Sequence, residues 1–547
     1  MTQISQKVRF VILAVLDGWG IAAKGPGNAI TLANTPNMDR FQASYPHTQL
    51  EASGQAVGLP RGEDGNTETG HLNLGAGRIV YQDLERINMA IADGTFYENK
   101  VLISAINHAR QFNSRLHIMG LIGAGGVHSN IEHLFALLEL ARKLNFQNVY
   151  LHLFTDGRDS PPTAALSYIK MVMQVLEKEK VGQIASIMGR YWAMDRDLRW
   201  ERTKVSYFAL TKGIANKVSN VTDAVNESYS RGKTDEFIEP YLIVRNNNTP
   251  VALIEENDAC VFFNFRIDRP RQLTAAFVME DFALFQNELD DYSLPTQKPF
   301  EKETLKNLFF VTMTEYSKKL VAEGARPAFP PEKVDVPLGL VISSRHMKQL
   351  RITESEKERF VTVYFNGLNE EIFLGEDRII IPSPKVSTYD LFPQMSALKL
   401  TERLMKELSR DIYKFILVNF PNPDMVGHTG NIGSAVTAIE TVDECIGRIA
   451  NFTLAHGGAL IITSDHGNAE EMINAATGEI DTEHSLNKVP FILVSRLYLG
   501  NPRTLAAGIL ADIAPTVLYL LDVEKPSAMT GQNLLKLLEE GKIGGLL

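Results

Sequence analysis

The sequence predicts an α/β protein built on parallel sheets, and two observations carry this prediction. Short apolar, β-branched runs alternate with helical patterns along the chain, which is typical of parallel strands joined by helices. Several of these runs end in aspartate, histidine or arginine, and open α/β sheets place their ligand sites at the carboxyl ends of strands. We therefore expect sheets covered by helices, with the functional residues gathered at one edge of each sheet.

The length and composition limit the classes of protein to which this chain can belong. At 547 residues the chain exceeds the usual size of a single domain, so two domains are expected. Its 55 basic and 65 acidic residues give a net charge of −10, which argues against a surface for nucleic acid or anionic membranes. No run approaches the roughly 20 apolar residues of a membrane helix. The first apolar run ends at Asp17 and is interpreted as a strand, not a signal peptide, so a cytoplasmic location is expected.

The two cysteines fit that location. Cys260 lies in an apolar run and Cys445 in a helical pattern, so both are expected to be buried free thiols. Scarce, unpaired cysteine is typical of a reducing compartment.

Three apolar runs predict a metal site at their strand ends. Residues 10–16 lead to Asp17, residues 415–420 lead to Asp424 and His428, and residues 459–463 lead to Asp465 and His466, with His484 following. Each residue alone is more typical of a turn, a helix cap or a solvated helix face. Their joint occurrence in a chain with only 12 histidines favours a metal. Carboxylate with imidazole suits Mn²⁺, Zn²⁺ or Fe²⁺, whereas Mg²⁺ and Ca²⁺ prefer oxygen ligands.

The middle of the chain predicts a second α/β domain, inserted into the first, whose strand ends carry arginine. We place the insertion at residues 82–310 and the outer, metal-binding domain at residues 1–81 and 311–547. Predicted strands at 116–122, 149–154, 184–188 and 260–263 lead to His128, Arg158, Asp159, Arg190, Arg196, Arg266 and Arg269. Arginine matches the oxygens of phosphate and carboxylate, so these positions indicate an anionic substrate; solvated surface ion pairs are the alternative. The glycine-rich turn at residues 123–126 does not complete a dinucleotide fingerprint, because residue 128 is histidine.

One segment carries a specific resemblance to a known family. Residues 62–78 read GEDGNTETGHLNLGAGR, and together with LDGWG at residues 16–20 they closely resemble the cofactor-independent phosphoglycerate mutases of the alkaline phosphatase superfamily. The resemblance extends in order over essentially the whole chain. It includes residues 126–129, 156–159, 190–196, 266–269 and 353–357, and both metal segments after residue 415.

This resemblance implies a fold and a set of site residues. The outer domain would be an alkaline-phosphatase-like metal domain and the inserted one a phosphotransferase domain, with substrate bound in the cleft between them. Asp424, His428 and His484 would hold one Mn²⁺, and Asp17, Asp465, His466 and the Thr67 hydroxyl would hold a second. His128, Arg158, Asp159, Arg190, Arg196, Arg266 and Arg269 would bind the glycerate and its phosphate, and Lys357 would contact the phosphate.

The activity that the resemblance implies is the interconversion of 2-phosphoglycerate and 3-phosphoglycerate in glycolysis and gluconeogenesis, without 2,3-bisphosphoglycerate. The Thr67 hydroxyl would attack phosphate on one glycerate hydroxyl, and the other hydroxyl would take it back from the phosphoenzyme. The only partner implied is this small-molecule substrate, and a monomer is expected.

Thr67 departs from the usual motif of that family, which has serine at this position. Residues 62–65 and Thr69 also differ from its commonest form. Threonine carries the same hydroxyl, but its methyl group restricts the side-chain rotamer and crowds the path of attack. Related phosphotransferases of the superfamily use threonine, so Thr67 is interpreted as the nucleophile; an enzyme impaired at this step is the alternative.

Three other functions stay open at this point. A phosphomutase of the superfamily that acts on pentose phosphates also uses threonine, although the arginine-rich inserted domain argues against it. A metal-dependent phosphomonoesterase would release phosphate instead of returning it to glycerate. A non-catalytic binding protein with the same fold would have lost ligand residues, and none is lost here apart from the change of serine to threonine.

Overall fold

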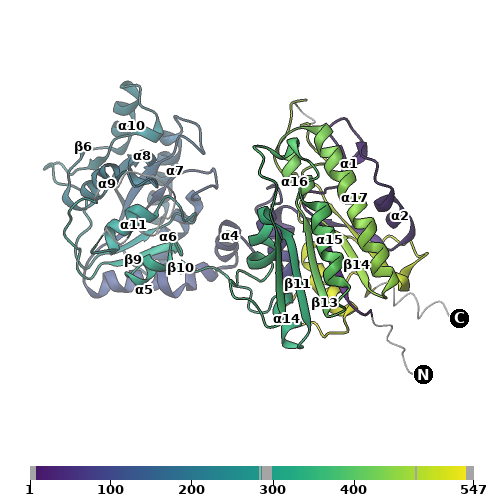
Figure 1. Ribbon diagram of the computed structural model, residues 1–547. Coiled ribbons are helices and arrows are strands. Elements are labelled where there is room, and N and C mark those ends of the chain that lie inside the picture. Colours follow the sequence, from purple (N-terminus) through teal and green to yellow (C-terminus); the bar gives the residue numbers. More distant parts are fainter. Residues whose placement is uncertain (1–7, 282–284, 286–298, 475–476, 537–547) are drawn as a thin grey trace. The chain divides into compact units, whose positions relative to one another are not determined.

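The computed structural model describes residues 8–281, 285, 299–474 and 477–536, which fold into two compact units (Figure 1). The first unit comprises Met1–Gln82 and Glu332–Leu547, and the second comprises Asp83–Pro331, so the second is inserted in the sequence of the first. Each unit is built around its own mostly parallel sheet with helices on both faces, and the predicted α/β class is thereby confirmed.

The end of the second unit differs from the expected position. Residues 311–331 were expected in the metal-binding domain, but they lie in the inserted unit. The reason is strand pairing: β9 (Phe309–Thr314) runs parallel to β8 (Ala259–Phe262), and β10 (Arg326–Phe329) runs parallel to β9. These two strands complete the edge of the inserted sheet, and the boundary therefore falls after residue 331 instead of after residue 310.

The sheet of the first unit has the strand order β12-β11-β13-β1-β14-β15-β2-β16. Its strands are β1 (Val11–Leu16), β2 (His47–Glu51), β11 (Lys348–Glu354), β12 (Glu376–Ile381), β13 (Tyr413–Phe420), β14 (Ala459–Thr463), β15 (Val489–Ser495) and β16 (Gly508–Ile509). The strands from β12 to β14 are mutually parallel, whereas β15 pairs antiparallel with β14 and β2. The carboxyl ends of β11, β13, β1 and β14 consequently lie at one edge of the sheet.

Helices cover both faces of this sheet because its central strands are apolar on both sides. Along β1, Val11 and Leu13 belong to a core with α3, α14 and α18, whereas Ile12 and Ala14 belong to a core with α2, α15 and α17. Figure 1 shows α15 and α17 lying along the strands β11, β13 and β14. The helices are α1 (Ala29–Leu32), α2 (Pro36–Ser44), α3 (Thr67–Ala76), α14 (Leu338–Ser344), α15 (Ala397–Leu408), α16 (Asn422–Gly427), α17 (Ile432–Ala455) and α18 (Ile513–Leu520).

The sheet of the second unit has the strand order β10-β9-β8-β3-β4-β5-β7-β6. Its remaining strands are β3 (Leu116–Leu121), β4 (Val149–Thr155), β5 (Gln183–Gly189), β6 (Asn216–Val218) and β7 (Tyr241–Ile243). All neighbours are parallel except β5 and β7. Because β8, β3, β4 and β5 are adjacent and parallel, their carboxyl ends also share one edge.

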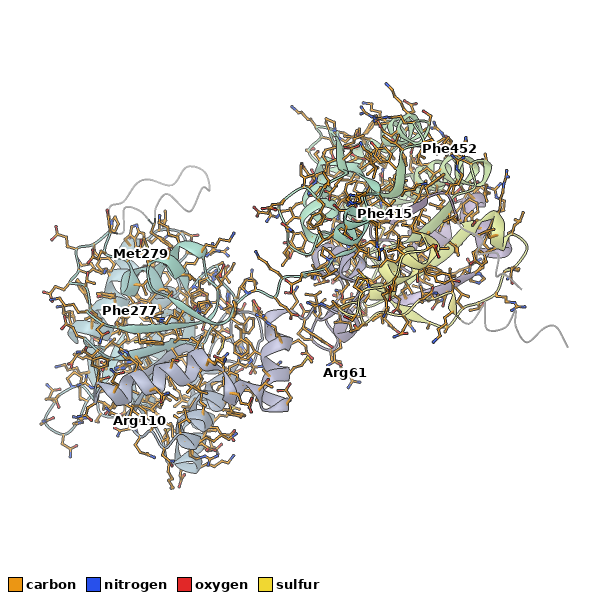
Figure 2. All side chains as sticks on the ribbon, turned by 90° about the horizontal axis from the view of Figure 1, so that it is seen from below. Arg61, Arg110, Phe277, Met279, Phe415 and Phe452 are labelled. Atoms are coloured by element: carbon orange, nitrogen blue, oxygen red, sulfur yellow. The ribbon has the colours of Figure 1, made fainter. Side chains whose placement is uncertain are left out.

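The second unit has a core on each face of its sheet. One core packs β3 and β4 against α4 (Asp83–Asp93), α5 (Lys100–Gln111), α6 (Ile131–Lys143), α7 (Ala165–Glu179) and α10 (Val221–Ser230). The other contains α8 (Arg190–Ala193), α9 (Trp200–Lys212), α11 (Arg271–Val278) and α13 (Lys318–Ala322). Phe277 and Met279 lie in this second core, and in the first unit Phe415 is fully buried on β13 (Figure 2).

Two further expectations concern single features. Cys260 of β8 and Cys445 of α17 are buried free cysteines, as predicted. In the part of the chain that the structure describes, none of the helices is both long and apolar enough to cross a lipid bilayer.

Candidate active site

Four neighbouring parallel strands of the first unit bring the predicted metal-site residues to one edge of their sheet. Asp17 follows β1, Asp424 lies in α16 directly after β13, and Asp465 and His466 follow β14. Lys357 ends a short 3₁₀ turn after β11. The last residues of β1 and β13 pair with each other in the sheet, so these segments leave it at the same level.

Thr67 is the first residue of α3 and is 6% exposed. Asn66 caps this helix, because its side-chain oxygen accepts a hydrogen bond from the Thr69 N–H at 3.0 Å. The Thr67 hydroxyl oxygen lies 3.0 Å from Nε2 of His466 and 2.9 Å from Nζ of Lys357. The partial positive charge of a helix N-terminus favours negative charge on a group bound there. The backbone of α3 therefore supports an alkoxide or a phosphate at Thr67.

Lys357 is the buried ammonium group of this cluster. Its Nζ donates hydrogen bonds to Asp17 Oδ1 and to Asp424 Oδ2, each at 2.7 Å. Burial alone would lower the pKa of Lys357, but the charges of Asp17 and Asp424 outweigh it and raise the pKa above its usual value. Lys357 therefore stays charged, and its charge faces the Thr67 hydroxyl.

Three histidines of the cluster are held in the tautomer that binds metals. Each Nδ1 faces a backbone carbonyl oxygen, at 2.7 Å for His428 to Thr482, 2.9 Å for His484 to Gly65 and 3.2 Å for His466 to Gly467. A carbonyl oxygen only accepts hydrogen bonds, so each Nδ1 carries a proton in the neutral ring and each Nε2 presents a lone pair. A backbone acceptor on the second ring nitrogen is the usual arrangement for a histidine ligand.

Two of these lone pairs converge on one carboxylate. Asp424 Oδ1 lies 3.2 Å from Nε2 of His428 and 3.3 Å from Nε2 of His484, and the two nitrogens lie 3.1 Å apart. Three acceptors at these distances repel one another unless a proton or a cation lies among them. The hydrogen bond to Asp424 accordingly raises the pKa of His428. Two imidazoles and a carboxylate are ligands of Mn²⁺, Zn²⁺ and Fe²⁺, and these residues therefore fit a divalent metal.

His466 lies between this group and two further carboxylates. Its Nε2 is 3.4 Å from Asp17 Oδ1 and 3.6 Å from Asp465 Oδ2, and all three side chains are fully buried. Burial would lower the pKa of His466, but Asp465 and Asp17 raise it to about 10. Among the described residues, two groups have ligand atoms within 4.8 Å of one another: Asp424, His466 and His484, and Asp17, His71 and Asp465.

His71 belongs to this cluster and was not among the predicted site residues. It is fully buried one helical turn after Thr67, and its Nδ1 lies 3.1 Å from both the Thr67 carbonyl oxygen and Asp465 Oδ2. Its Nε2 lies 3.2 Å from Nδ2 of Asn419, which also donates to Asp17 Oδ2 at 2.8 Å. His71 thus joins the helix of Thr67 to two acidic residues. Its spacing of four residues from Thr67 was the available signal in the sequence.

The predicted substrate-binding residues of the second unit also lie at adjacent strand ends. In this unit, each follows one of four neighbouring parallel strands: His128 after β3, Arg158 and Asp159 after β4, Arg190 and Arg196 after β5, and Arg266 and Arg269 after β8. The expected clustering of these strand ends is therefore present in the fold of the second unit.

Arg190 is the most buried of these arginines, with 3% of its side chain exposed. Its Nη1 donates to Asp156 Oδ1 at 2.6 Å and to Asp159 Oδ2 at 2.5 Å. Burial, together with the positive charge of Arg190, lowers the pKa of the neighbouring His128 to about 4. His128 is therefore neutral at physiological pH and can both donate and accept a hydrogen bond.

The more exposed arginines are paired with acidic residues that were not predicted as part of the site. Arg196 Nη1 donates to Asp268 Oδ2 at 2.6 Å, and Arg266 Nε lies 3.3 Å from Asp268 Oδ1. Arg158 Nε lies 2.8 Å from Glu236 Oε1. Asp268 stands between Arg266 and Arg269 in the sequence, so the alternation of charge was the signal that could have identified it. A phosphate or carboxylate ligand would compete with these carboxylates for the guanidinium groups.

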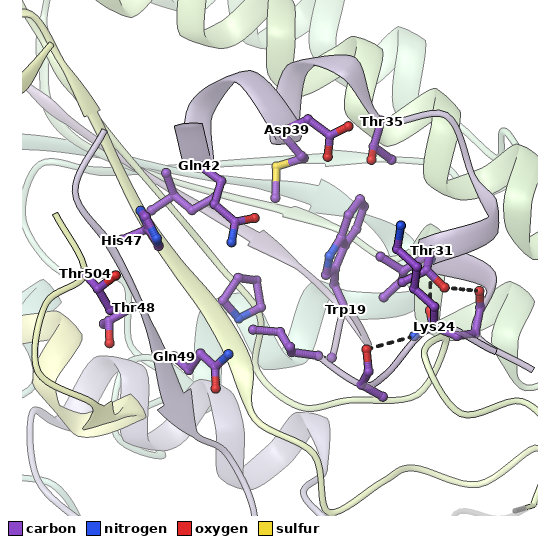
Figure 3. Close-up of a pocket in the computed structure, with 18 of the residues that line it drawn as sticks. Trp19, Lys24, Thr31, Thr35, Asp39, Gln42, His47, Thr48, Gln49 and Thr504 are labelled. Atoms are coloured by element: carbon purple, nitrogen blue, oxygen red, sulfur yellow. Dashed lines mark hydrogen bonds between the residues drawn. The ribbon is translucent and has the colours of Figure 1, made fainter. Parts of the chain in front are cut away.

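A separate pocket of about 610 Å³ opens in the first unit beside the loop that follows Asp17 (Figure 3). Trp19 and Gly20 from this loop line it, together with Gln42 of α2 and His47 and Gln49 of β2. None of the predicted site residues lines this pocket. The loop after Asp17 thus has a predicted metal ligand at its start and lines the pocket with Trp19.

Comparison with known proteins gives consistent matches over nearly the whole chain. A family described as the BPG-independent PGAM N-terminus matches residues 87–318. A 2,3-bisphosphoglycerate-independent phosphoglycerate mutase from Clostridium beijerinckii is 50% identical over 525 residues, which are 96% of this chain and 98% of that protein. A protein of the same name from Moorella thermoacetica is 49% identical over 527 residues, with coverage of 96% and 98%.

A solved structure supports the same relationship. It is a phosphoglycerate mutase from Leishmania mexicana, whose crystal structure was determined at low cobalt concentration. The match covers 97% of this chain and 98% of the solved chain, with 28% sequence identity and a TM-score of 0.59.

Proposed function

Because this chain belongs to the family of 2,3-bisphosphoglycerate-independent phosphoglycerate mutases, we propose that it interconverts 2-phosphoglycerate and 3-phosphoglycerate without 2,3-bisphosphoglycerate. One observation supports this assignment above the others. The hydroxyl of Thr67 lies at the N-terminus of a buried helix, within 3.0 Å of both an ammonium and an imidazole group. This is the environment that an oxygen nucleophile for phosphoryl transfer requires.

The proposed reaction has two half-reactions at Thr67. In the first, Thr67 Oγ1 attacks the phosphorus of the substrate, the bond from phosphorus to the glycerate oxygen breaks, and glycerate leaves with a proton on that oxygen. In the second, the other glycerate hydroxyl attacks phosphothreonine, loses its proton, and releases the Thr67 oxygen. Atoms balance within the pair, so no second phosphate donor is needed. Escape of glycerate between the steps would let water attack instead and give a phosphatase reaction.

Lys357 and α3 favour the charged forms of these species. Lys357 stays protonated between Asp17 and Asp424, and its Nζ lies within hydrogen-bond distance of the Thr67 oxygen. A fixed positive charge at this distance lowers the cost of forming the Thr67 alkoxide and of gathering negative charge on the phosphoryl group. The N-terminus of α3 acts in the same direction, because its partial charge is also positive.

We infer two Mn²⁺ ions as the metals of this site. Asp424, His428 and His484 would hold one ion, and Asp17, Asp465, His466 and Thr67 the other. The support is the chemistry of the donors: at four contacts in this cluster an imidazole nitrogen lies 3.2–3.6 Å from a carboxylate oxygen. A bound divalent cation supplies a lower pKa for a coordinated hydroxyl and neutralises charge on the transferring phosphoryl group.

We assign the binding of glycerate and its phosphate to the second unit. The candidates are His128, Arg158, Asp159, Arg190, Arg196, Arg266 and Arg269, and Lys357 of the first unit contacts the phosphate. The support is that these arginines stand at adjacent strand ends, several of them held by carboxylates that an anionic ligand can replace. The proposal also includes a monomer in the cytoplasm; size-exclusion chromatography with light scattering tests the oligomeric state.

An enolase-coupled assay tests the proposed function. Purified protein with Mn²⁺ and 3-phosphoglycerate should produce 2-phosphoglycerate, and added 2,3-bisphosphoglycerate should leave the rate unchanged. Inorganic phosphate is measured in the same samples. Release of phosphate without isomer would make the protein a phosphomonoesterase, and a rate that depends on bisphosphoglycerate would contradict the proposed mechanism.

A further inference from the structure

A buried carboxylate that belongs to none of the predicted ligand sets joins three loops of the metal cluster. Glu470 is 2% exposed. Its Oε2 accepts hydrogen bonds from the backbone N–H of Gly20 at 3.0 Å and of Asn468 at 2.9 Å. Its Oε1 accepts from the hydroxyl of Ser485 and from Nδ2 of Asn487, the latter at 3.1 Å.

Each of these donors stands close in sequence to a predicted metal ligand. Gly20 follows Asp17 in the loop after β1, and Asn468 follows His466 in the loop after β14. Ser485 is the residue directly after His484. Glu470 thus contacts the three segments that carry these ligands, and the segment of Asp17 is separated by more than 400 residues from those of His466 and His484.

Asn468 also links Glu470 to Asp424, another predicted metal ligand. The backbone of Asn468 donates to Glu470, and its side-chain Nδ2 donates to Asp424 Oδ1 at 3.2 Å. The loops are also joined directly, because the Ser485 N–H donates to the Gly467 carbonyl oxygen at 3.1 Å. A shift of the Glu470 side chain would therefore be transmitted to more than one ligand at once.

Two glycines leave the space that this carboxylate occupies. A Cβ atom at Gly20 would lie 2.2 Å from the carboxyl carbon of Glu470. A Cβ atom at Gly467 would lie 2.3 Å from Glu470 Oε1 and 2.4 Å from the Ser485 hydroxyl oxygen. Any other residue at these positions would displace Glu470 or its partners, so the local sequence is matched to a carboxylate at position 470.

From these contacts we propose that Glu470 is a positioning residue that sets the geometry of the metal site, an inference that rests on the proposed function. All four partners present hydrogen-bond donors, and an ionised carboxylate accepts at both oxygens. Glutamine has nearly the same shape, but its amide nitrogen must face either two backbone N–H groups or the Ser485 and Asn487 pair. The substitution Glu470→Gln therefore disrupts the hydrogen bonds at one of the two carboxylate oxygens, with little change in side-chain volume.

The test compares metal binding in chelated proteins. Isothermal titration with Mn²⁺ should show an affinity about 10–100-fold weaker for Glu470→Gln than for the parent, the usual effect of losing a group that orients ligands. The absorption spectrum of the Co²⁺-loaded variant should also differ from that of the parent at saturating metal. Glu407→Gln is the matched control, because Glu407 is a buried carboxylate of the same unit whose partners include Arg403, Arg410 and Tyr413. It should match the parent in both measurements.

A second variant displaces the Glu470 carboxylate without changing residue 470, and it tests the proposal if Glu470→Gln does not fold. Gly20→Ala keeps the backbone N–H but places a methyl group against Glu470, and it should weaken Mn²⁺ binding in the same way. Gly25→Ala is its control, since a Cβ atom there meets nothing within 4 Å. In active preparations the kcat of Glu470→Gln should fall tenfold or more, while the KM for phosphoglycerate changes less than twofold.

The outcomes distinguish a failure of the positioning role of Glu470 from a failure of the proposed metal site. Parental Mn²⁺ affinity and an unchanged Co²⁺ spectrum in Glu470→Gln, or in Gly20→Ala if that is the variant that folds, would overturn the positioning role alone. A parent protein that binds no Mn²⁺ would contradict the proposed metal site and this inference together.

Discussion

Lys357 Nζ lies 2.9 Å from the hydroxyl oxygen of Thr67, although the two residues come from opposite sides of the inserted unit in the sequence. Lys357 follows the end of β11, and Thr67 begins α3. Both side chains are buried, so the charge of Lys357 acts on the hydroxyl with little screening by water. In the proposed reaction, this charge would stabilise negative charge on the Thr67 oxygen.

The first prediction concerns this charge. Lys357→Ala should lower kcat by about 10²–10³, the usual loss when a group that stabilises transition-state charge is removed. Lys348→Ala is the control, because Lys348 lies at the other end of β11 with about half of its side chain exposed. The enolase-coupled assay measures both variants. A kcat for Lys357→Ala within threefold of the parent would remove Lys357 from the reaction.

The second prediction concerns the arginines of the second unit. Arg266→Ala should raise the KM for 3-phosphoglycerate about 10–100-fold, since a charged hydrogen bond is worth about 1.5–3 kcal/mol. Lysine at the same position should rescue only partly, because it lacks the planar fork of arginine. Arg231→Ala provides the comparison: Arg231 is half exposed and pairs with Glu227 on α10, and its loss should leave KM unchanged. Equal KM values for Arg266→Ala and the parent would exclude Arg266 from the site.

The third prediction concerns metal dependence. Chelation with EDTA should abolish mutase activity, and Mn²⁺ should restore it better than Mg²⁺, because the donors include imidazole as well as carboxylate. Activity should also fall as the pH is lowered, since protons compete with the metal for His428, His466 and His484. Elemental analysis after dialysis is the accompanying measurement. Full activity in protein shown to be free of metal would be incompatible with the proposed site.

The fourth prediction concerns stability against acid in the second unit. Burial lowers the pKa of His133 on α6 to about 3, whereas an exposed histidine titrates near 6.5. Below about pH 6.5 the unfolded chain binds a proton there that the folded chain does not. Stability is therefore fully present above that pH and is lost as the pH falls toward 3, by up to about 4 kcal/mol.

Urea unfolding at a series of pH values measures this effect. In the variant His133→Gln the side-chain amide can still donate to Asn88 Oδ1, the partner of His133 Nε2 at 3.0 Å. This variant should show a weaker loss of stability between pH 6.5 and 4 than the parent does. His456→Gln, at an exposed position, should follow the parent. Parallel curves for His133→Gln and the parent would show that His133 does not contribute.

The strand ends of both units could be read from the sequence because a buried parallel strand is apolar throughout and stops where a polar turn begins. Residues 459–463 coincide with β14, and residues 415–420 fall within β13. The edge of the inserted sheet could not be placed in this way. β9 looks like any other apolar strand in the sequence, whereas β10 is short and contains Arg326 and Pro327. Only the pairing of β9 with β8, and of β10 with β9, assigns them to the second unit.

The residues that the sequence did not reveal act through other side chains. His71 lies within the motif at residues 62–78 and Glu470 lies close to His466, but their contacts with Asp465 and Gly20 join segments that are hundreds of residues apart in the sequence. Asp268 was hidden for a different reason, since an acidic residue among arginines is typical of a surface ion pair. The residues proposed as metal ligands were easier to single out, because each follows an apolar strand or lies in a short motif.

Substitutions at Thr67 test whether this residue is the nucleophile. Thr67→Ala should lose mutase and phosphatase activity together while it still folds and binds Mn²⁺. Thr67→Ser should stay active and should be as fast as the parent or faster, because the methyl group no longer crowds the hydroxyl. Thr69→Ala is the control on the same helix, since among the described residues the Thr69 hydroxyl donates hydrogen bonds to Asn66 alone. A serine variant that is active beside an inactive parent would show that threonine impairs this step.

Trapping the phosphoenzyme tests the account most directly. The Mn²⁺-loaded protein is mixed with 3-phosphoglycerate, quenched in denaturant within one turnover, digested, and its peptides are sequenced by mass spectrometry. The account predicts phosphate on Thr67, with none on the same peptide from Thr67→Ala. Phosphate on another residue, or turnover by the alanine variant at a rate near that of the parent, would contradict it.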